Sequence, residues 1–207
     1  MSSRISISGV RDAVLITGVL IGAVWAVQFV NYTTDDSLVT HGVTPRRADE
    51  LPDILTAPFL HFGTGHIVSN TFPLMLLGFL AALRGVARFL LVLLTITVVG
   101  GFGVWLTAPS GSNTAGASIL VFGLFGYLIV RGFADRRVLD VLIGFAVVAL
   151  YGSSFAIGLL PLAEGVSWQG HLFGLIGGVV AAVALRRRRH DARRDAPGLA
   201  PAGPPIV

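Results

Sequence analysis

Four polar side chains within otherwise apolar segments are the residues of this sequence best suited to chemistry. Ser118 opens an apolar run, and a serine hydroxyl becomes a nucleophile when a neighbouring base removes its proton. His171 is the candidate base, because the pKa of a free imidazole is close to neutral pH. The Asn70 amide, the His66 ring and the Ser118 backbone N–H are candidate donors to an oxyanion. Together these groups predict acyl transfer.

Each of these residues also has a purely structural interpretation. A serine among small residues commonly marks close packing of membrane helices, and His66 and Asn70 can serve as hydrogen bonds between helices. For His171 the sequence favours neither a packing role nor a functional one. A metal site built from His61, His66 and His171 is a further alternative, but residues five apart diverge on a helix and no carboxylate lies at their level. We therefore expect no metal and no cofactor.

The composition defines the class of protein. Of 207 residues, 54% are hydrophobic and only 13% are charged, which predicts an integral membrane protein. Cysteine is absent, which excludes disulfides and cysteine zinc sites. All fifteen basic residues are arginines that lie at the ends of apolar runs and in the C-terminal tail, without interleaved aromatic residues. This pattern argues against a nucleic acid partner and indicates topology signals at the lipid interface.

Six apolar runs predict an all-α membrane protein, a bundle of six transmembrane helices. The fourth run has only 16 residues, about 24 Å as a helix, whereas the hydrocarbon core is about 30 Å thick. If Arg131, Arg136 and Arg137 hold its C-terminal end at the interface, the end that carries Ser118 is submerged. The runs are Ala13–Asn31, His66–Leu83, Phe89–Ala108, Ala115–Val130, Val138–Leu160 and Val166–Leu185.

The arginines also predict the domain organisation and the orientation. Residues 1–12 form an N-terminal segment, residues 13–185 the membrane domain, and residues 186–207 an arginine-rich tail that we expect to be disordered. Thirteen of the fifteen arginines fall on one side of the six spans, and only Arg46 and Arg47 fall on the other. The positive-inside rule then places both termini in the cytoplasm of a multi-pass cell-membrane protein. No inverted repeat is evident, which disfavours a transporter.

The topology brings the four polar residues to one depth. The second, fourth and sixth runs cross in the same direction, so their N-terminal ends share a level near the outer face. His66 and Asn70 are four residues apart and lie on one helical face. Phe122, one turn after Ser118, is placed to stack on the His171 ring. Glycines at every fourth position of the last run allow another helix to lie close, and these are Gly170, Gly174 and Gly178.

At these residues the chain resembles the rhomboid intramembrane serine proteases. The resemblance covers about Ala13–Leu185, and it implies a Ser118/His171 dyad without an acidic third member and an oxyanion site at His66 and Asn70. It also implies that transmembrane segments of other proteins are cut near their outer ends, and that Val138–Ser167 contains a mobile gate. The matching residues are His61, Phe62, His66, Asn70, Gly116, Ala117, Ser118, Phe122, Gly123, Gly170, His171, Gly174 and Gly178.

Two positions depart from the family pattern. The residue after the nucleophile is Ile119 instead of the usual glycine, and its branched side chain is a candidate to crowd the substrate or the oxyanion site. The Trp-Arg pair common in the first loop is absent, and Pro45, Arg46 and Arg47 stand in its general place. The main hypothesis is a cofactor-independent intramembrane serine endopeptidase whose partners are membrane lipids and transmembrane substrates. The alternative, mildly favoured by Ile119, is an inactive rhomboid-like protein that binds transmembrane helices.

Overall fold

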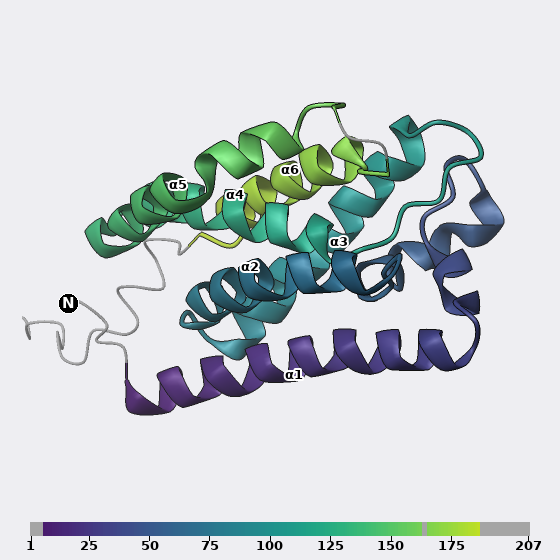
Figure 1. Ribbon diagram of the computed structural model, residues 1–207. Helices are drawn as coiled ribbons and strands as arrows, with labels where there is room; N and C mark the ends of the chain where they lie inside the picture. The colour runs from purple at the N-terminus through teal and green to yellow at the C-terminus, as the bar shows by residue number, and fades with distance from the viewer. Residues whose placement is uncertain (1–5, 163–164, 187–207) are drawn as a thin grey trace, which may run out of the picture.

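The computed structural model describes residues 6–162 and 165–186 and confirms an all-α bundle (Figure 1). Between the first two long helices lie three short 3₁₀ helices, η1 (Ser37–His41), η2 (Ala48–Ile54) and η3 (Ala57–Phe59). The described residues contain no strand beyond a single bridge. The long helices are α1 (Ile7–Thr33), α2 (Thr64–Ala82), α3 (Val86–Thr107), α4 (Ser118–Asp135), α5 (Val138–Gly158) and α6 (Trp168–Ala184).

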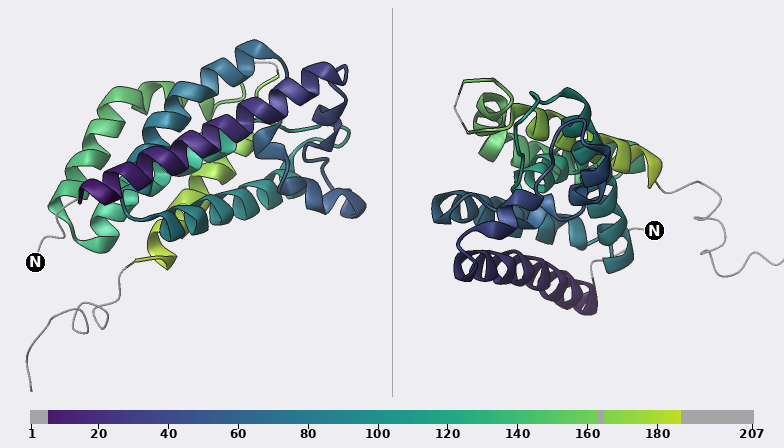
Figure 2. Two further views of the ribbon diagram at one scale, coloured as in Figure 1. Left: turned by 90° about the horizontal axis from the view of Figure 1, so that it is seen from below. Right: turned by 90° about the vertical axis from the view of Figure 1, so that its right-hand side faces the viewer.

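Helix α4 lies at the centre of the bundle. It packs against α2, α3, α5 and α6, while α1 lies along the outside of α2 (Figures 1 and 2). Most α4 side chains are buried, and Leu124, Tyr127 and Leu128 have no exposed surface. Apolar side chains on the outer helices face away from this core, as expected where the solvent is lipid. Helices α1 to α5 are each long and apolar enough to cross a membrane, and α6 is a shorter apolar helix.

The prediction for the fourth span was wrong at its C-terminal end. Helix α4 has 18 residues, not 16, and it begins at Ser118 and passes through Arg131 to end at Asp135. Arg131 does not lie at the interface, because its side chain is only 1% exposed and donates to Asp140 Oδ1 at 3.0 Å and to the Leu80 carbonyl at 3.1 Å. The apolar run therefore continues past an arginine whose charge is paired inside the bundle.

The predicted limits of the first span and of the C-terminal tail can be compared with the described residues. Helix α1 begins at Ile7, six residues before the predicted first span, so it takes in half of the predicted N-terminal segment. The predicted disordered tail, 186–207, lies outside the described residues except for Arg186. The other four spans begin and end within a few residues of their predicted limits.

The predicted glycine face of α6 is present and faces α4. A Cβ added at Gly174 would collide with the carbonyl oxygen of Ile119, and one added at Gly178 would collide with the carbonyl oxygen of Gly123. The backbones of α4 and α6 are therefore in contact, which only residues without side chains permit. This close approach brings the start of α4, with Ser118, beside the start of α6, with His171.

The Ile119 side chain points away from the start of α4 into the interface with α3. A Cβ added at Gly100 of α3 would lie 2.6 Å from Ile119 Cδ1. Ile119 is only 8% exposed and belongs to the main core cluster. Its branched side chain thus fills the space that glycine leaves at position 100.

Candidate active site

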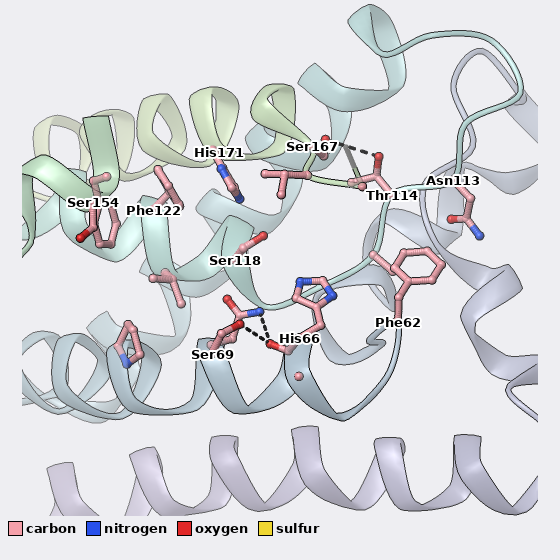
Figure 3. A pocket seen from close by; sticks show the side chains of 18 residues that line it. Phe62, His66, Ser69, Asn113, Thr114, Ser118, Phe122, Ser154, Ser167 and His171 are labelled. Carbon is pink, nitrogen blue, oxygen red and sulfur yellow. Dashed lines mark hydrogen bonds between the residues drawn. The ribbon is translucent and has the colours of Figure 1, made fainter. Parts of the chain in front are cut away.

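A cavity of about 650 Å³ opens at the end of the bundle where α4 and α6 begin (Figure 3). All four residues singled out for chemistry, Ser118, His171, His66 and Asn70, line it. In Figure 3 the labelled side chains of Ser118, His66 and His171 point into the same space from three different helices. Helix α5 contributes Ser154 and Phe155, and the segment before α6 contributes residues 165–167.

The backbone that leads into Ser118 is held by the first loop. The Gly116 N–H donates to the Ala57 carbonyl at 2.9 Å, and the Ala117 N–H donates to His61 Nε2 at 3.1 Å. Gly116 has φ of 135°, a conformation that favours glycine, and the His66 ring occupies the place of its missing side chain. Ser118 is then the first residue of α4, where backbone N–H groups have no acceptor within the helix.

The same loop is tied to the segment before α4 by a second set of bonds. Val43 and Thr114 exchange two backbone hydrogen bonds of 2.8 and 3.0 Å. The Arg46 guanidinium donates to the Ala108 carbonyl at 3.0 Å and to Ser110 Oγ at 2.6 Å. Arg46 therefore links the first loop to the end of α3.

His61 holds the backbone that leads into Ser118, a role that residue type alone did not reveal. Its side chain has no exposed surface, and burial, reinforced by the neighbouring His66 ring, lowers the pKa of His61 to about 4. The ring is therefore neutral at pH 7, as it must be for Nε2 to accept the Ala117 N–H. This bond occupies the lone pair that a metal would need, so His61 does not fit the metal site considered from the sequence.

His171 is fixed from two sides. Phe122 stacks on its ring as predicted, with ring centroids 3.9 Å apart and planes 5° from parallel. The carbonyl oxygen of Gly158, the last residue of α5, lies 2.6 Å from His171 Nδ1. A carbonyl only accepts, so Nδ1 carries the hydrogen and Nε2 of the neutral ring has a free lone pair.

His66 and Asn70 lie on the α2 side of the cavity. The Asn70 amide donates one hydrogen to the His66 carbonyl at 3.0 Å, which leaves its second hydrogen for another acceptor. The His66 ring lies parallel to Phe62, with centroids 6.5 Å apart, and edge-on to His61. The Asn70 amide and the His66 ring are thus held in place by their neighbours, and each keeps an N–H donor for a further acceptor.

The cavity brings together the predicted chemical groups, with one difference. Across the described part of the chain, the Ser118 hydroxyl forms no hydrogen bond, so the expected bond to His171 is not made in this structure. Catalytic hydrogen bonds are often long before substrate binds. The predicted supporting residues Gly116, Gly170 and Gly174 lie behind the cavity: Gly116 is under His66, Gly170 is beside Thr114, and Gly174 is against α4.

The chemistry of the cavity is that of neutral polar groups. Among its described lining residues there is no carboxylate, lysine or arginine. Nor do the described residues bring three His, Asp or Glu side chains together in a group able to hold a metal ion. What the cavity offers is several hydroxyls, that of Ser118 among them, the His171 imidazole with a free lone pair and several N–H donors. Sequence reasoning identified these side chains, but it missed the Gly158 carbonyl, because a backbone acceptor leaves no signal in residue type.

The amino-acid sequence is similar to a known domain family and to several bacterial proteins. Residues 48–188 match the model of the Rhomboid domain. An uncharacterized protein of Mycobacterium leprae is 39% identical over 189 residues, covering 84% of this chain and 74% of its own length. An uncharacterized protein of Mycobacterium tuberculosis is 36% identical over 181 residues, covering 84% and 75%. The rhomboid protease GluP of Bacillus subtilis is 32% identical over 133 residues, which are 64% of this chain and 25% of GluP.

Proposed function

The chain belongs to the rhomboid family, and from that premise we propose that it is an intramembrane serine endopeptidase that cuts transmembrane segments of other membrane proteins. The observation that carries the proposal is the shared cavity. Ser118, His171, His66 and Asn70 come from three helices that are far apart in the sequence, yet all four line one space. Polar side chains inside a membrane protein are costly, which favours a functional reason for gathering them.

In the proposed reaction Ser118 is the nucleophile and His171 the base. As Ser118 Oγ bonds to the scissile carbonyl carbon, its proton passes to His171 Nε2 and the carbonyl electron pair moves onto oxygen. As the C–N bond breaks, the leaving amine takes that proton from Nε2. A water molecule then gives its proton to Nε2 and attacks the acyl carbon, and the bond to Ser118 Oγ breaks, which releases the carboxyl product and returns the proton to Ser118. Phe122 keeps the imidazole ring in one rotamer during both proton transfers.

The oxyanion has three candidate donors. The second hydrogen of the Asn70 amide and the His66 ring approach from α2, and the Ser118 N–H approaches from the start of α4. The Ala117 N–H is not among them, because it is bonded to His61. Donors fixed in advance stabilise the developing charge without reorganising during the reaction.

The surroundings of the cavity support a helical substrate. Its walls include Ser69 and Pro73 of α2 and Ser154 and Phe155 of α5, so both helices border it. A transmembrane segment that enters between α2 and α5 reaches Ser118 from within the bilayer. We further propose, from the arginine distribution, that this end of the bundle faces outward and that both termini are cytoplasmic.

Ile119 was the residue that favoured an inactive, helix-binding protein. It does not line the cavity, and its side chain packs toward Gly100 of α3. The reason for proposing an inactive, helix-binding protein is therefore weaker. The endopeptidase is the function that the site supports best.

The test is cleavage of a single-span model protein by the purified full chain in detergent. We expect the native chain to cut, and Ser118→Ala and His171→Ala each to lose at least about a thousandfold in kcat. Ser112→Ala is the matched control, because this partly exposed serine lies in the loop before α4 and its hydroxyl bonds only to the Pro109 carbonyl. Activity that persists in Ser118→Ala would contradict the assignment. Failure of the native chain on several substrates would instead support the helix-binding alternative.

A further inference from the structure

The end of α5 contacts the proposed base directly. Gly158 is the last residue of α5, and its carbonyl accepts the hydrogen bond of 2.6 Å from His171 Nδ1. This is a short hydrogen bond for a nitrogen donor. It comes from a helix other than those that carry the nucleophile and the base, so a third element takes part in the geometry of the dyad.

The packing around this bond leaves little room for a side chain at position 158. A Cβ at position 158 would lie 2.6 Å from Phe122 Cζ and 3.3 Å from His171 Nδ1, closer than a side chain can approach without displacing the rings. One turn earlier, Phe155 packs on Phe122 and on Phe125, with ring centroids 4.4 and 4.1 Å apart. The imidazole is thus held between an aromatic ring of α4 and the backbone of α5.

We infer that the Gly158 carbonyl is the positioning group of the dyad and does the work that an aspartate does in a Ser-His-Asp triad. The inference rests on the proposed function. In a triad the aspartate accepts the Nδ1 hydrogen, which selects the tautomer with Nε2 free and stabilises the imidazolium that forms. Here no described lining residue of the cavity is a carboxylate, and the Gly158 carbonyl occupies the place of that acceptor. The Nδ1 hydrogen stays on His171 throughout, while the transferred proton arrives and leaves at Nε2.

The position of the end of α5 depends on this same bond. In the half of this helix nearest the cavity, Phe155 is the buried side chain, and the rest of that half is largely exposed. The end of α5 is therefore seated by the Phe155 contacts and the Gly158 hydrogen bond. Any displacement of this end that breaks the bond also frees the imidazole to take the other tautomer, so the position of α5 sets the competence of the base.

The experiment weakens the carbonyl without changing a side chain. The α-hydroxy analogue of leucine at position 159 turns the peptide bond after Gly158 into an ester, whose carbonyl is a poorer acceptor. It also removes the Leu159 N–H, which bonds to the Phe155 and Ala156 carbonyls. The same analogue at position 160 is the matched control, because it removes the Leu160 N–H bond to Ile157 and leaves the Gly158 carbonyl intact.

We expect the ester at 159 to lower kcat by about tenfold with KM unchanged, and the ester at 160 to stay within about twofold of native. In ¹⁵N spectra of the imidazoles, with the His171 signals assigned by their loss in His171→Ala, the fraction protonated at Nε2 should rise only for the ester at 159. Equal kcat and equal spectra for the two esters, in a chain that cleaves, would overturn the inference.

A second pair of variants uses ordinary side chains. Gly158→Ala should lose at least about tenfold in kcat, because its Cβ displaces Phe122 or the carbonyl. Gly152→Ala should match native, since a Cβ there meets only Val148 of its own helix at 3.4 Å. If the native chain cuts nothing, the proposed function fails, and the tautomer spectra alone still decide whether Gly158 holds His171.

Discussion

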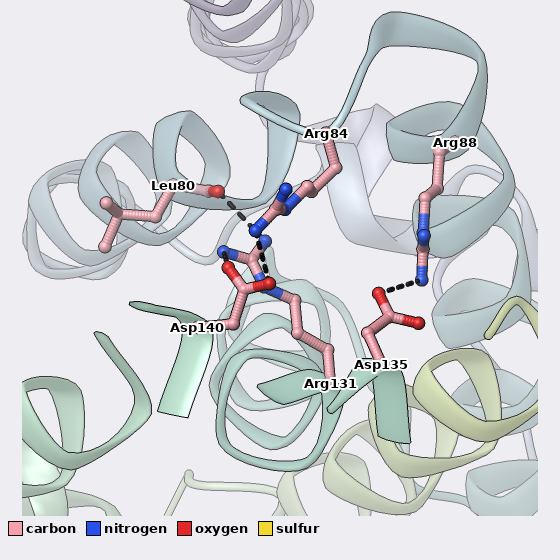
Figure 4. A network of polar contacts seen from close by, with 6 residues as sticks. All are labelled: Leu80, Arg84, Arg88, Arg131, Asp135 and Asp140. Atoms are coloured by element: carbon pink, nitrogen blue, oxygen red, sulfur yellow. Dashed lines mark hydrogen bonds and ion pairs between the residues drawn. The ribbon is translucent and has the colours of Figure 1, made fainter. Parts of the chain in front are cut away.

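The two ends of α5 hold polar groups in opposite ways. At its first turn Asp140 has no exposed surface, and its two carboxylate oxygens meet Arg131 and Arg84, while Arg88 pairs with Asp135 nearby (Figure 4). At its last turn there is an uncharged cavity. In it the Ser118 hydroxyl, the free His171 nitrogen and one Asn70 hydrogen make no hydrogen bond to the described residues. A buried charge is costly once its partner is removed, whereas polar groups with spare hydrogen-bonding capacity are available for chemistry.

The largest effect is expected where Ile119 fills the space beside Gly100. Ile119→Gly should lower the free energy of unfolding by about 3–6 kcal/mol, because it leaves a cavity in the core and places glycine inside a helix. It should not raise kcat per folded molecule, since Ile119 does not line the site. Unfolding in detergent and kcat, measured together, check this. A more active and equally stable variant would show that Ile119 obstructs the site.

At the charged end, Asp140→Ala should lower the free energy of unfolding by about 3–5 kcal/mol, because it leaves the buried Arg131 and the partly buried Arg84 without their carboxylate. Asp12→Ala is the matched control, since the Arg11–Asp12 pair is exposed and should contribute at most about 1 kcal/mol. The kcat of folded Asp140→Ala should stay near native. Equal stability of the two variants would remove the structural role assigned to the cluster.

At the cavity end the expected pattern is reversed. Asn70→Ala should lower kcat by about a hundred- to a thousandfold, the usual cost of one oxyanion donor, with little change in KM. Its unfolding free energy should change far less than that of Asp140→Ala. A variant that keeps full kcat would take Asn70 out of the oxyanion site.

The smallest expected effect is the contribution of His61 to the pH dependence of the unfolding free energy. Its pKa is about 4 in the folded chain and about 6.5 in the unfolded chain, so between these values the unfolded chain binds more protons. The stability from neutral His61 is fully present above pH 6.5 and is lost as the pH falls toward 4, by about 2 kcal/mol between pH 6 and 4.5. His61→Gln, which can still accept the Ala117 N–H, should lack this component. Parallel pH curves for the two proteins would contradict the role of His61.

The sequence predicted what depends on the chemistry of single residues and on helix direction. Apolar runs gave the six helices, and alternation of direction was enough to bring Ser118 and His171 to one end. It predicted the stacking of Phe122 on His171, but not the ion pairs and side-chain packing between other helices. Arg131 looked like an interfacial anchor because its partner Asp140 lies on the next helix, and the fit of Ile119 to Gly100 depends on how α3 meets α4. Gly158 acts through its backbone, which residue type does not reveal.

The most direct test of the central claim is covalent capture of the nucleophile. A fluorophosphonate reacts with an activated serine, whose oxygen bonds to phosphorus as fluoride leaves, and peptide mass spectrometry then identifies the modified residue. We predict one adduct, on Ser118, that is lost in His171→Ala and retained in Ser112→Ala. An adduct on another serine, or labelling of Ser118 that persists without His171, would contradict the account of a Ser118 nucleophile activated by His171.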